Sequence, residues 1–304
     1  MMIPFIKYGK FWIIISTFTI AAALVLVVMW GLKPGIDFTG GSLMEITFSK
    51  IRPASGEIQQ AMGSVGISNV TVQHADENGI IARSSFLNED DHQKALAEIR
   101  KRFQTDGNEV REDSFQTIGA AVSKQLRSRA LWAVILVNAG IIVYIAYAFR
   151  RVSRPVASWK YGLLAIWSLI HDVLLVMGVF AVLGKFYGVE VDIAFVVAIL
   201  TVLGYSVNDT IVVYDRIREN LQTSRNDNFS DTVNMGLNQS LMRSINTTAK
   251  TLLPLLALYF LGGTTIHYFA LALIIGIASG AYSSIFVAAP WLVLVEKWQR
   301  RATA

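Results

Sequence analysis

Long apolar runs with almost no charge recur along this chain, and they constrain its fold more than any other feature. A helix needs roughly 20 apolar residues to cross a hydrocarbon core about 30 Å thick. Five runs come close to that length, at residues 11–30, 130–148, 162–183, 193–214 and 268–295. A sixth, LLPLLALYFLGG at 252–263, reaches it only when counted back to Arg243. We therefore predict a polytopic α-helical membrane protein with six transmembrane helices.

The composition supports a membrane protein and excludes several other classes. Of the 304 residues, 53% are hydrophobic and 16% are charged, whereas about 25% of the residues of a soluble domain are charged. The chain has no cysteine, no GxxxxGK[ST] phosphate loop and no HExxH motif, so thiolate metal sites and this mode of ATP binding are excluded. We expect no cofactor, no metal, no enzymatic activity and no nucleic-acid partner.

Basic residues in the short connections predict the orientation. By the positive-inside rule, they gather on the cytoplasmic side. The short loops of the opposite side contain only Lys185. Both termini are therefore predicted to be cytoplasmic and residues 34–128 periplasmic, with residues 11–30 a retained anchor because no A-x-A cleavage site follows. The cytoplasmic set is Lys7, Lys10, Arg150, Arg151, Arg154, Lys160, Arg216, Arg218, Arg225, Arg243, Lys250, Lys297, Arg300 and Arg301.

Three parts are expected: residues 1–33 (N-terminus and first span), 34–128 (outer domain) and 129–304 (the remaining five spans). The outer domain alternates strand and helix signals. SLMEITF and GIIARSSF favour strands, and NEDDHQKALAEIRKRF favours a helix capped by Asn88. The predicted order is βαββαβ, the ferredoxin-like α+β pattern. His74 and His92 are expected at the surface, and no catalytic constellation is evident.

One acidic residue falls inside a predicted span. Asp209 lies about 16 residues into the span at 193–214, roughly 24 Å from its outer end. A carboxylate there costs a few kcal/mol and faces other helices or water rather than lipid. It shares a helical stripe with Thr201, Gly204, Tyr205 and Asn208. Asp209 is either a proton carrier or a structural acid paired with an arginine.

The fifth span offers a partner for that acid. Arg243 should lie near the cytoplasmic surface, about 5 Å from the level of Asp209 and within reach of a long side chain. A carboxylate whose arginine partner comes and goes would take up and release a proton. Thr247 and Thr248 either line a polar pathway or bond their own backbone. Pro254 could bend this span, and residues 229–245 could form an amphipathic interfacial helix leading into it.

A second pair of titratable residues, His171 and Asp172, lies near the middle of the third span. Adjacent helical positions point about 100° apart, so the two cannot fully share a face. They either relay protons or hydrogen-bond between helices for assembly. Asp192, at the start of the fourth span, is expected to cap its helix.

Three motifs together resemble a known family. GIDFTGG at 35–41 is, on spacing alone, a glycine-rich turn with Asp37 as a local cap. Taken with HDV at 171–173 and LTVLGYSVNDTIVVYDRIREN at 200–220, it closely resembles the SecF members of the SecD/SecF family of protein-export membrane proteins. The resemblance covers most of the chain. It departs at Gly119-Ala120, where a Gly-Pro pair is expected.

The resemblance implies a function. SecD and SecF form two halves of a bundle of the RND superfamily, and the proton-motive force drives movements of their outer domains that promote preprotein translocation across the bacterial inner membrane. The implied partners are SecD, the SecYEG translocon, YajC, the preprotein and the lipid bilayer, with protons as the coupling ion. Asp209 becomes the proton carrier, next to Asn208, and Arg243 its charge partner. The signature loop comprises Gly35, Asp37, Phe38, Gly40 and Gly41.

Two alternatives remain. In the first, the chain is a passive assembly subunit in which Asp209 and Arg243 pin helices together. In the second, it is half of a small-molecule exporter. An exporter predicts a large outer domain with an apolar or aromatic pocket, whereas the four aromatic residues between 42 and 118 are expected to be needed for the core: Phe48, Phe86, Phe103 and Phe115.

Overall fold

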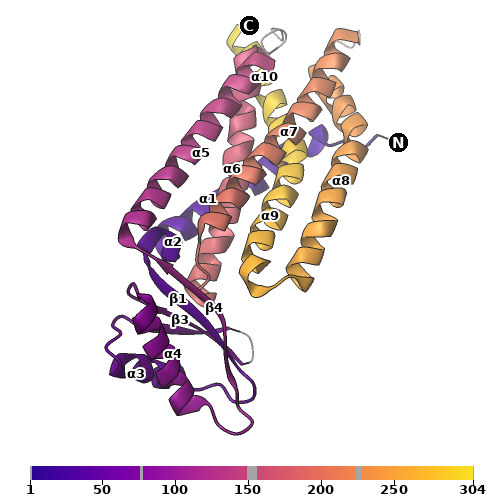
Figure 1. Ribbon diagram of the computed structural model, residues 1–304. Coiled ribbons are helices and arrows are strands. Elements are labelled where there is room, and N and C mark those ends of the chain that lie inside the picture. The colour runs from indigo at the N-terminus through magenta and orange to yellow at the C-terminus, as the bar shows by residue number, and fades with distance from the viewer. Residues whose placement is uncertain (1, 76–77, 149–155, 224–227, 304) are drawn as a thin grey trace. The chain divides into compact units, whose positions relative to one another are not determined.

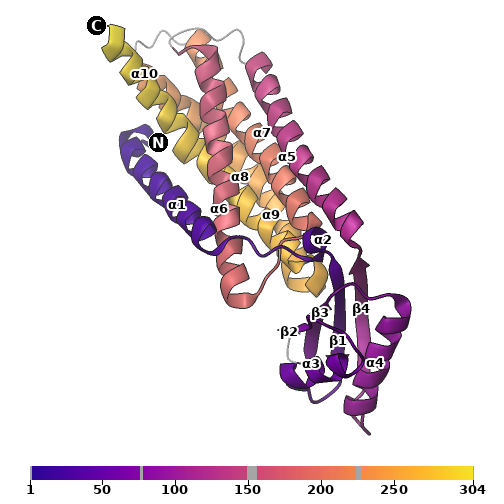
Figure 2. The same cartoon turned by 90° about the vertical axis from the view of Figure 1, so that its left-hand side faces the viewer.

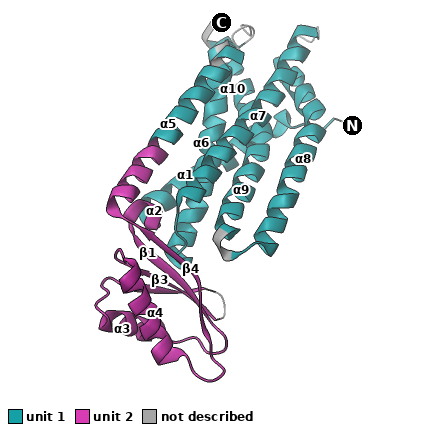
Figure 3. Ribbon diagram, viewed as in Figure 1, with its two compact units in different colours: residues 1–33, 132–304 teal, residues 34–131 magenta. Residues whose placement is uncertain are grey.

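The computed structural model describes residues 2–75, 78–148, 156–223 and 228–303 (Figure 1). Two compact units are distinguished: residues 34–131 form the outer unit, and residues 1–33 with 132–304 form the helical unit (Figure 3). Four basic residues that contribute to the predicted orientation, Arg150, Arg151, Arg154 and Arg225, lie outside the described residues.

The helical unit consists of long helices. Within the described residues, five helical stretches are long and apolar enough to cross a membrane: Ile6–Trp30, Ala120–Ile145, Trp159–Tyr187, Ile193–Thr223 and Ile266–Arg301. The chain is thus a multi-pass membrane protein. The elements are η1 (Ile6–Tyr8), α1 (Gly9–Trp30), α5 (Ala120–Ala148, which runs through both units), α6 (Ser158–Tyr187), α7 (Ile193–Thr223), α8 (Phe229–Leu261), α9 (Thr264–Ser283), η2 (Ser284–Ala288) and α10 (Ala289–Thr303).

Helix α8 is one continuous helix and contains Pro254. Residues 229–245, expected as an interfacial helix leading into the fifth span, form the first half of this helix, and no proline interrupts the chain before Pro254. Helix α8 is not among the five apolar stretches. The start of α7 is capped as expected: Asp192 Oδ1 accepts a hydrogen bond from the backbone N–H of Phe195 at 2.8 Å.

The last predicted span consists of α9, η2 and α10 in direct succession. Its middle, η2, is a π-helix. Pro290 follows two residues later; it has no N–H to donate to the preceding turn, and its ring clashes with the carbonyl four residues before it. Wide turns of this kind commonly lie at functional sites.

Helices α7 and α9 approach each other closely through glycines. A Cβ atom on Gly276 would lie 2.2 Å from Val202 Cγ2, and one on Gly280 would lie 2.9 Å from the Cβ of Ser206. Small residues four positions apart allow such backbone approach between membrane helices. On another side of the unit, α1 packs against α6 and α10 (Figure 2).

The outer unit contains a four-stranded antiparallel sheet in the order β2-β3-β1-β4. Strand β1 buries alternate side chains, Met44, Ile46 and Phe48. These side chains pack with residues of α3 and α4 in one apolar core. Asn88 caps α4, accepting a hydrogen bond from the Asp91 N–H at 2.9 Å, as expected. The elements are α2 (Ile36–Thr39), β1 (Gly41–Phe48), α3 (Ser55–Ser64), β2 (Thr71–Ala75), β3 (Gly79–Ser84), α4 (Glu89–Phe103) and β4 (Val110–Ile118).

The expectation that His92 lies at the surface is wrong. Its side chain is buried, its Nε2 atom lies 2.6 Å from Glu112 Oε1, and its ring stacks on Phe115 with centroids 3.7 Å apart. His74 is exposed, with its Nε2 atom 3.0 Å from Ser55 Oγ.

Candidate functional site

Asp209 lies among hydroxyl groups in the interior of the helical unit. Its side chain is buried. Both carboxylate oxygens accept hydrogen bonds from Ser244 Oγ of α8, each at 2.9 Å, and Oδ2 also accepts one from Ser284 Oγ of η2. Three neighbouring segments therefore meet at this carboxylate, and two of them contribute neutral donors.

Arg243 does not contact Asp209 through a hydrogen bond or an ion pair among the described residues. It is exposed on α8. Ser244 occupies the next position and points about 100° away around the helix, which brings its hydroxyl to the carboxylate. Asp209 is therefore hydrogen-bonded to Ser244, the residue that follows the predicted partner Arg243.

The two threonines after Arg243 behave differently. Thr247 is exposed, and its hydroxyl donates to the Arg243 carbonyl at 2.8 Å within its own helix. Thr248 is buried and accepts a hydrogen bond from the Tyr205 hydroxyl at 3.2 Å. Thr248 therefore links α8 to α7, and Thr247 does not.

The predicted stripe on α7 is split between two faces. Thr201, Gly204 and Asn208 are exposed, whereas Asp209 is buried. Arg243, Thr247 and Lys250 form an exposed polar row on α8. Polar side chains on helix faces at membrane depth are costly when they face lipid.

Asp172 is a second buried carboxylate, and it is fully supplied with hydrogen-bond donors. It is 0% exposed. Oδ1 accepts from Ser279 at 2.7 Å and lies 3.0 Å from His171 Nδ1, while Oδ2 accepts from Ser206 at 2.5 Å and Ser283 at 2.8 Å. These bonds join α6, α7 and α9, so Asp172 holds three helices together.

His171 lies beside this carboxylate despite the 100° between adjacent helical positions. Its imidazole bends back to Asp172 and stacks on the Tyr282 ring, with centroids 6.1 Å apart. The ring is buried, and its Nε2 atom has no hydrogen-bond partner among the described residues.

The serines that serve these carboxylates were not predicted as site residues. Three of the five lie close together in the apolar stretch IASGAYSSIF, and this clustering, rather than the residue type, is the signal that could have found them. The close approach through Gly276 and Gly280 carries this stretch against α7. The set is Ser206, Ser244, Ser279, Ser283 and Ser284.

The GIDFTGG segment forms a one-turn helix, α2, followed by a glycine pair within the outer unit. Gly35, not Asp37, is the N-cap residue of this turn; Asp37 and Phe38 lie within it, half-buried. Gly40 and Gly41 have φ values of 75° and 117°, and a Cβ atom on Gly41 would lie 2.6 Å from the Ser84 carbonyl oxygen. Glycine is therefore required where the chain enters β1.

Comparisons with known proteins agree along the whole chain. Residues 98–298 match the family described as "Protein export membrane protein SecD/SecF, C-terminal", and residues 31–50 match "SecD/SecF GG Motif". Protein translocase subunit SecF of Thermobaculum terrenum is 42% identical, over 99% of this chain and 95% of that protein. The corresponding subunit of Synechocystis sp. is 36% identical, over 95% of this chain and 92% of its own length.

Longer relatives contain this region as one part. Protein translocase subunit SecDF of Brucella abortus is 35% identical over 96% of this chain, which spans 37% of that protein. The crystal structure of SecDF from Thermus thermophilus, described as a translocon-associated membrane protein, superposes with a TM-score of 0.84 at 28% identity. It covers 98% of this chain, and the chain spans 39% of its length.

Proposed function

Because the chain belongs to the SecD/SecF family of protein-export membrane proteins and aligns along its length with SecF subunits, we propose that it acts as a SecF-type accessory subunit of the Sec translocon. In this role it promotes preprotein translocation across the bacterial inner membrane without a nucleotide site, as a translocation subunit rather than an enzyme.

The second half of the bundle would be SecD. Relatives named SecDF contain a region like this one within a chain more than twice as long. The exposed polar positions Asn208 on α7, and Arg243 and Lys250 on α8, support a protein partner at this face, since lipid is a poor neighbour for them. Together the two subunits would form the RND-type bundle.

We assign the sixth span to α8. Its 33 residues correspond to about 50 Å of helix, well beyond the 30 Å of a hydrocarbon core. Its polar positions lower its hydropathy, and a SecD partner would cover them. With six spans, both termini lie on the same side of the membrane, and the basic residues of the short loops would make that side the cytoplasm and residues 34–128 periplasmic. The outer unit would adopt the ferredoxin-like fold, a proposal supported by its strand order β2-β3-β1-β4.

Asp209 is proposed as the proton carrier. The observation that carries this proposal is a buried carboxylate whose hydrogen-bond donors are two neutral hydroxyls, Ser244 and Ser284. Either hydroxyl can rotate to accept a hydrogen bond from a protonated carboxyl, so a proton can be exchanged without breaking an ion pair. Arg243 would approach the carboxylate in another state of the cycle, and Asn208 and Thr248 would border the pathway. The gradient would thereby move the outer unit against the preprotein, beside SecYEG and YajC.

The test is preprotein translocation into inverted membrane vesicles that contain the chain with its SecD partner, with and without a proton gradient. Asp209→Asn should assemble normally but lose the stimulation by the gradient. Asp215→Asn is the matched control on the same helix, because Asp215 is exposed and paired with Arg218. Stimulation that persists in Asp209→Asn would refute the proton-carrier role and favour passive assembly.

Passive assembly has specific support at the other carboxylate. Asp172 accepts hydrogen bonds from three serines on two other helices, which fits a structural connection. We assign assembly to Asp172 and proton transfer to Asp209. The pair His171–Asp172 would then respond to the gradient less than Asp209 does.

A further inference from the structure

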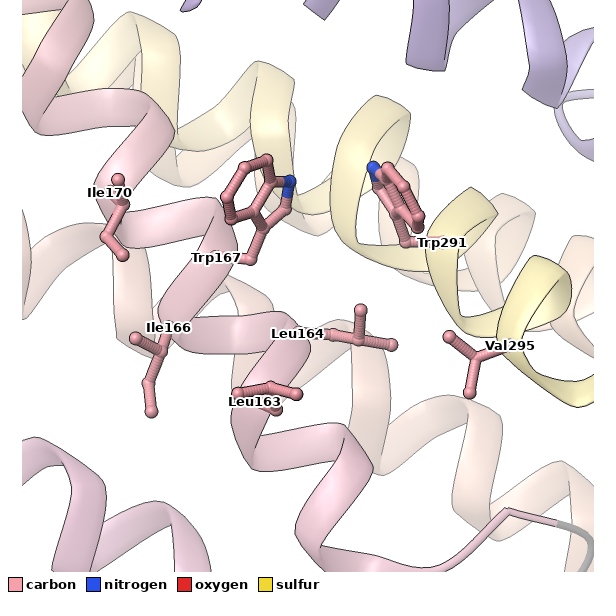
Figure 4. Close-up of a pocket in the computed structure, with 7 residues that line it drawn as sticks. All are labelled: Leu163, Leu164, Ile166, Trp167, Ile170, Trp291 and Val295. Carbon is pink, nitrogen blue, oxygen red and sulfur yellow. The ribbon is translucent and has the colours of Figure 1, made fainter. Parts of the chain in front are cut away.

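An apolar groove of about 380 Å³ lies between α6 and α10 (Figure 4). Helix α6 contributes Leu163, Trp167 and Ile170, and α10 contributes Trp291 and Val295. The two indole rings meet edge to face across the groove, with centroids 6.4 Å apart. Every side chain that lines the groove is hydrocarbon or indole, so its occupant is an apolar chain rather than a polar solute.

The two helical stripes that line the groove end in the same kind of residue. On α6, the positions one turn before Leu163 are Trp159 and Lys160. On α10, the positions one turn after Val295 are Trp298 and Gln299. Trp159 and Trp298 are exposed, and tryptophan is enriched where a membrane meets water. The groove therefore runs from membrane depth to an interface.

Lys160 marks the interfacial end of the groove. Its Nζ atom donates a hydrogen bond to Gln299 Oε1 of α10 at 2.9 Å and lies 5.6 Å from the Trp159 ring centroid. No carboxylate pairs with it among the described residues. An ammonium group has three donors, so the lysine is held in place and still has donors for an anion. Lys297 and Arg301 are exposed on another face of α10, outside the groove.

We propose that this groove binds an anionic phospholipid, with one acyl chain between α6 and α10 and the phosphate at Lys160. The apolar lining matches the chain, and the ammonium group matches the headgroup charge. Basic pockets between membrane helices at the interface bind anionic headgroups. The site lies in the leaflet that meets Lys160, whichever partners the protein has.

The experiment measures lipids retained by the full chain. The protein is purified from nanodiscs that contain equal amounts of phosphatidylglycerol and phosphatidylcholine, and bound lipid is quantified by native mass spectrometry. The wild type should retain phosphatidylglycerol in excess. Lys160→Gln should lower that retention about fivefold, the factor that corresponds to one basic residue at an anionic surface.

Two further variants separate the groove from general electrostatics. Leu163→Trp fills the groove from an exposed position, so the fold should be retained, and it should lower the retention of both lipids. Lys297→Gln removes the same charge outside the groove and should leave the retention of both lipids unchanged.

Three results of the retention measurement would overturn the proposal: equal retention of both lipids, equal losses in Lys160→Gln and Lys297→Gln, or full retention in Leu163→Trp. A photoreactive residue at Ile170 should crosslink to lipid. Crosslinking to a protein partner instead would assign the groove to a partner helix and reject the lipid.

Discussion

Ser283 and Ser284 are consecutive residues, yet their hydroxyls donate to two different buried carboxylates. Ser283 donates to Asp172 of α6, and Ser284 donates to Asp209 of α7. The two residues mark the junction between α9 and the π-helix η2. One short segment thus connects the carboxylate we assign to assembly with the one we assign to proton transfer.

Removal of a serine from Asp172 should destabilise the helical unit. Ser279→Ala leaves a buried carboxylate with one donor fewer, at a cost of about 1–3 kcal/mol. Thr247→Ala is the control, since Thr247 is exposed and its hydroxyl bonds its own helix. Its free energy of unfolding should stay within about 0.5 kcal/mol of the wild-type value. Reversible unfolding in mixed micelles measures both changes. Equal stabilities would show that Asp172 does not depend on the serine.

Helix approach at Gly280 gives a second prediction. In Gly280→Ala, the new methyl group would meet Ser206 at 2.9 Å, and overpacking of this kind costs about 1–3 kcal/mol. Gly140→Ala has nothing within 4 Å of its new methyl group and should be neutral or slightly stabilising. Thermal unfolding of the two proteins in the same detergent compares them. A Gly280→Ala protein as stable as the wild type would mean that α7 and α9 can separate without loss.

His92 should support the outer unit. In His92→Ala, the ring stacked on Phe115 and the partner of Glu112 are both lost, which should cost about 1–3 kcal/mol. His74→Ala, at an exposed position, should change the free energy of unfolding by no more than about 0.5 kcal/mol. Protease resistance of the outer unit in the intact chain reports the difference. Equal resistance of the two variants would contradict the structural role of His92.

Glu45 should give the outer unit a pH dependence. Burial raises the pKa of its carboxyl above the ordinary value of 4.5, Asp113 raises it further, and Arg83 lowers it. The folded state therefore binds this proton more tightly than the unfolded chain. The resulting stability is fully present below pH 4.5 and is lost as the pH rises through the raised pKa.

Glu45→Gln should therefore make the outer unit more resistant to proteolysis at neutral pH and reduce the change in resistance between about pH 4 and pH 8. Glu109→Gln, at an exposed position, is the control. A pH profile in Glu45→Gln identical to that of the wild type would assign the dependence to another group.

The sequence predicts the long helices and the sheet well because their signals are periodic. The alternation in SLMEITF predicts the strand observed as β1, and the apolar runs coincide with α1, α6 and α7. His92 shows a signal that was missed: it lies four and seven residues before Leu96 and Ile99, on the buried stripe of α4. A histidine on such a stripe can be buried when one of its ring nitrogens has a partner, as Nε2 of His92 has in Glu112.

The partners of the carboxylates could not be predicted, because they depend on helix rotation. Arg243 and Ser244 differ by one position and about 100° of direction, and only packing against α7 decides which of them faces Asp209. Serine is also common in apolar helices, so Ser279, Ser283 and Ser284 do not stand out by type. Gly276 and Gly280 set the approach that makes them partners.

The π-helix η2 has a consequence for the phase of its helix. A π turn closes its hydrogen bonds over one residue more than an α turn. The segment therefore contains one residue more than an α-helical turn would hold. If this wide turn moved toward α9, the residues it passed would rotate by about 100° about the helix axis. A residue passed in this direction points where the residue before it pointed, so Ser284 would point where Ser283 now points, toward Asp172. Asp209 would thus lose its hydroxyl donor on this segment through a shift of register, without any change in the length of the helix.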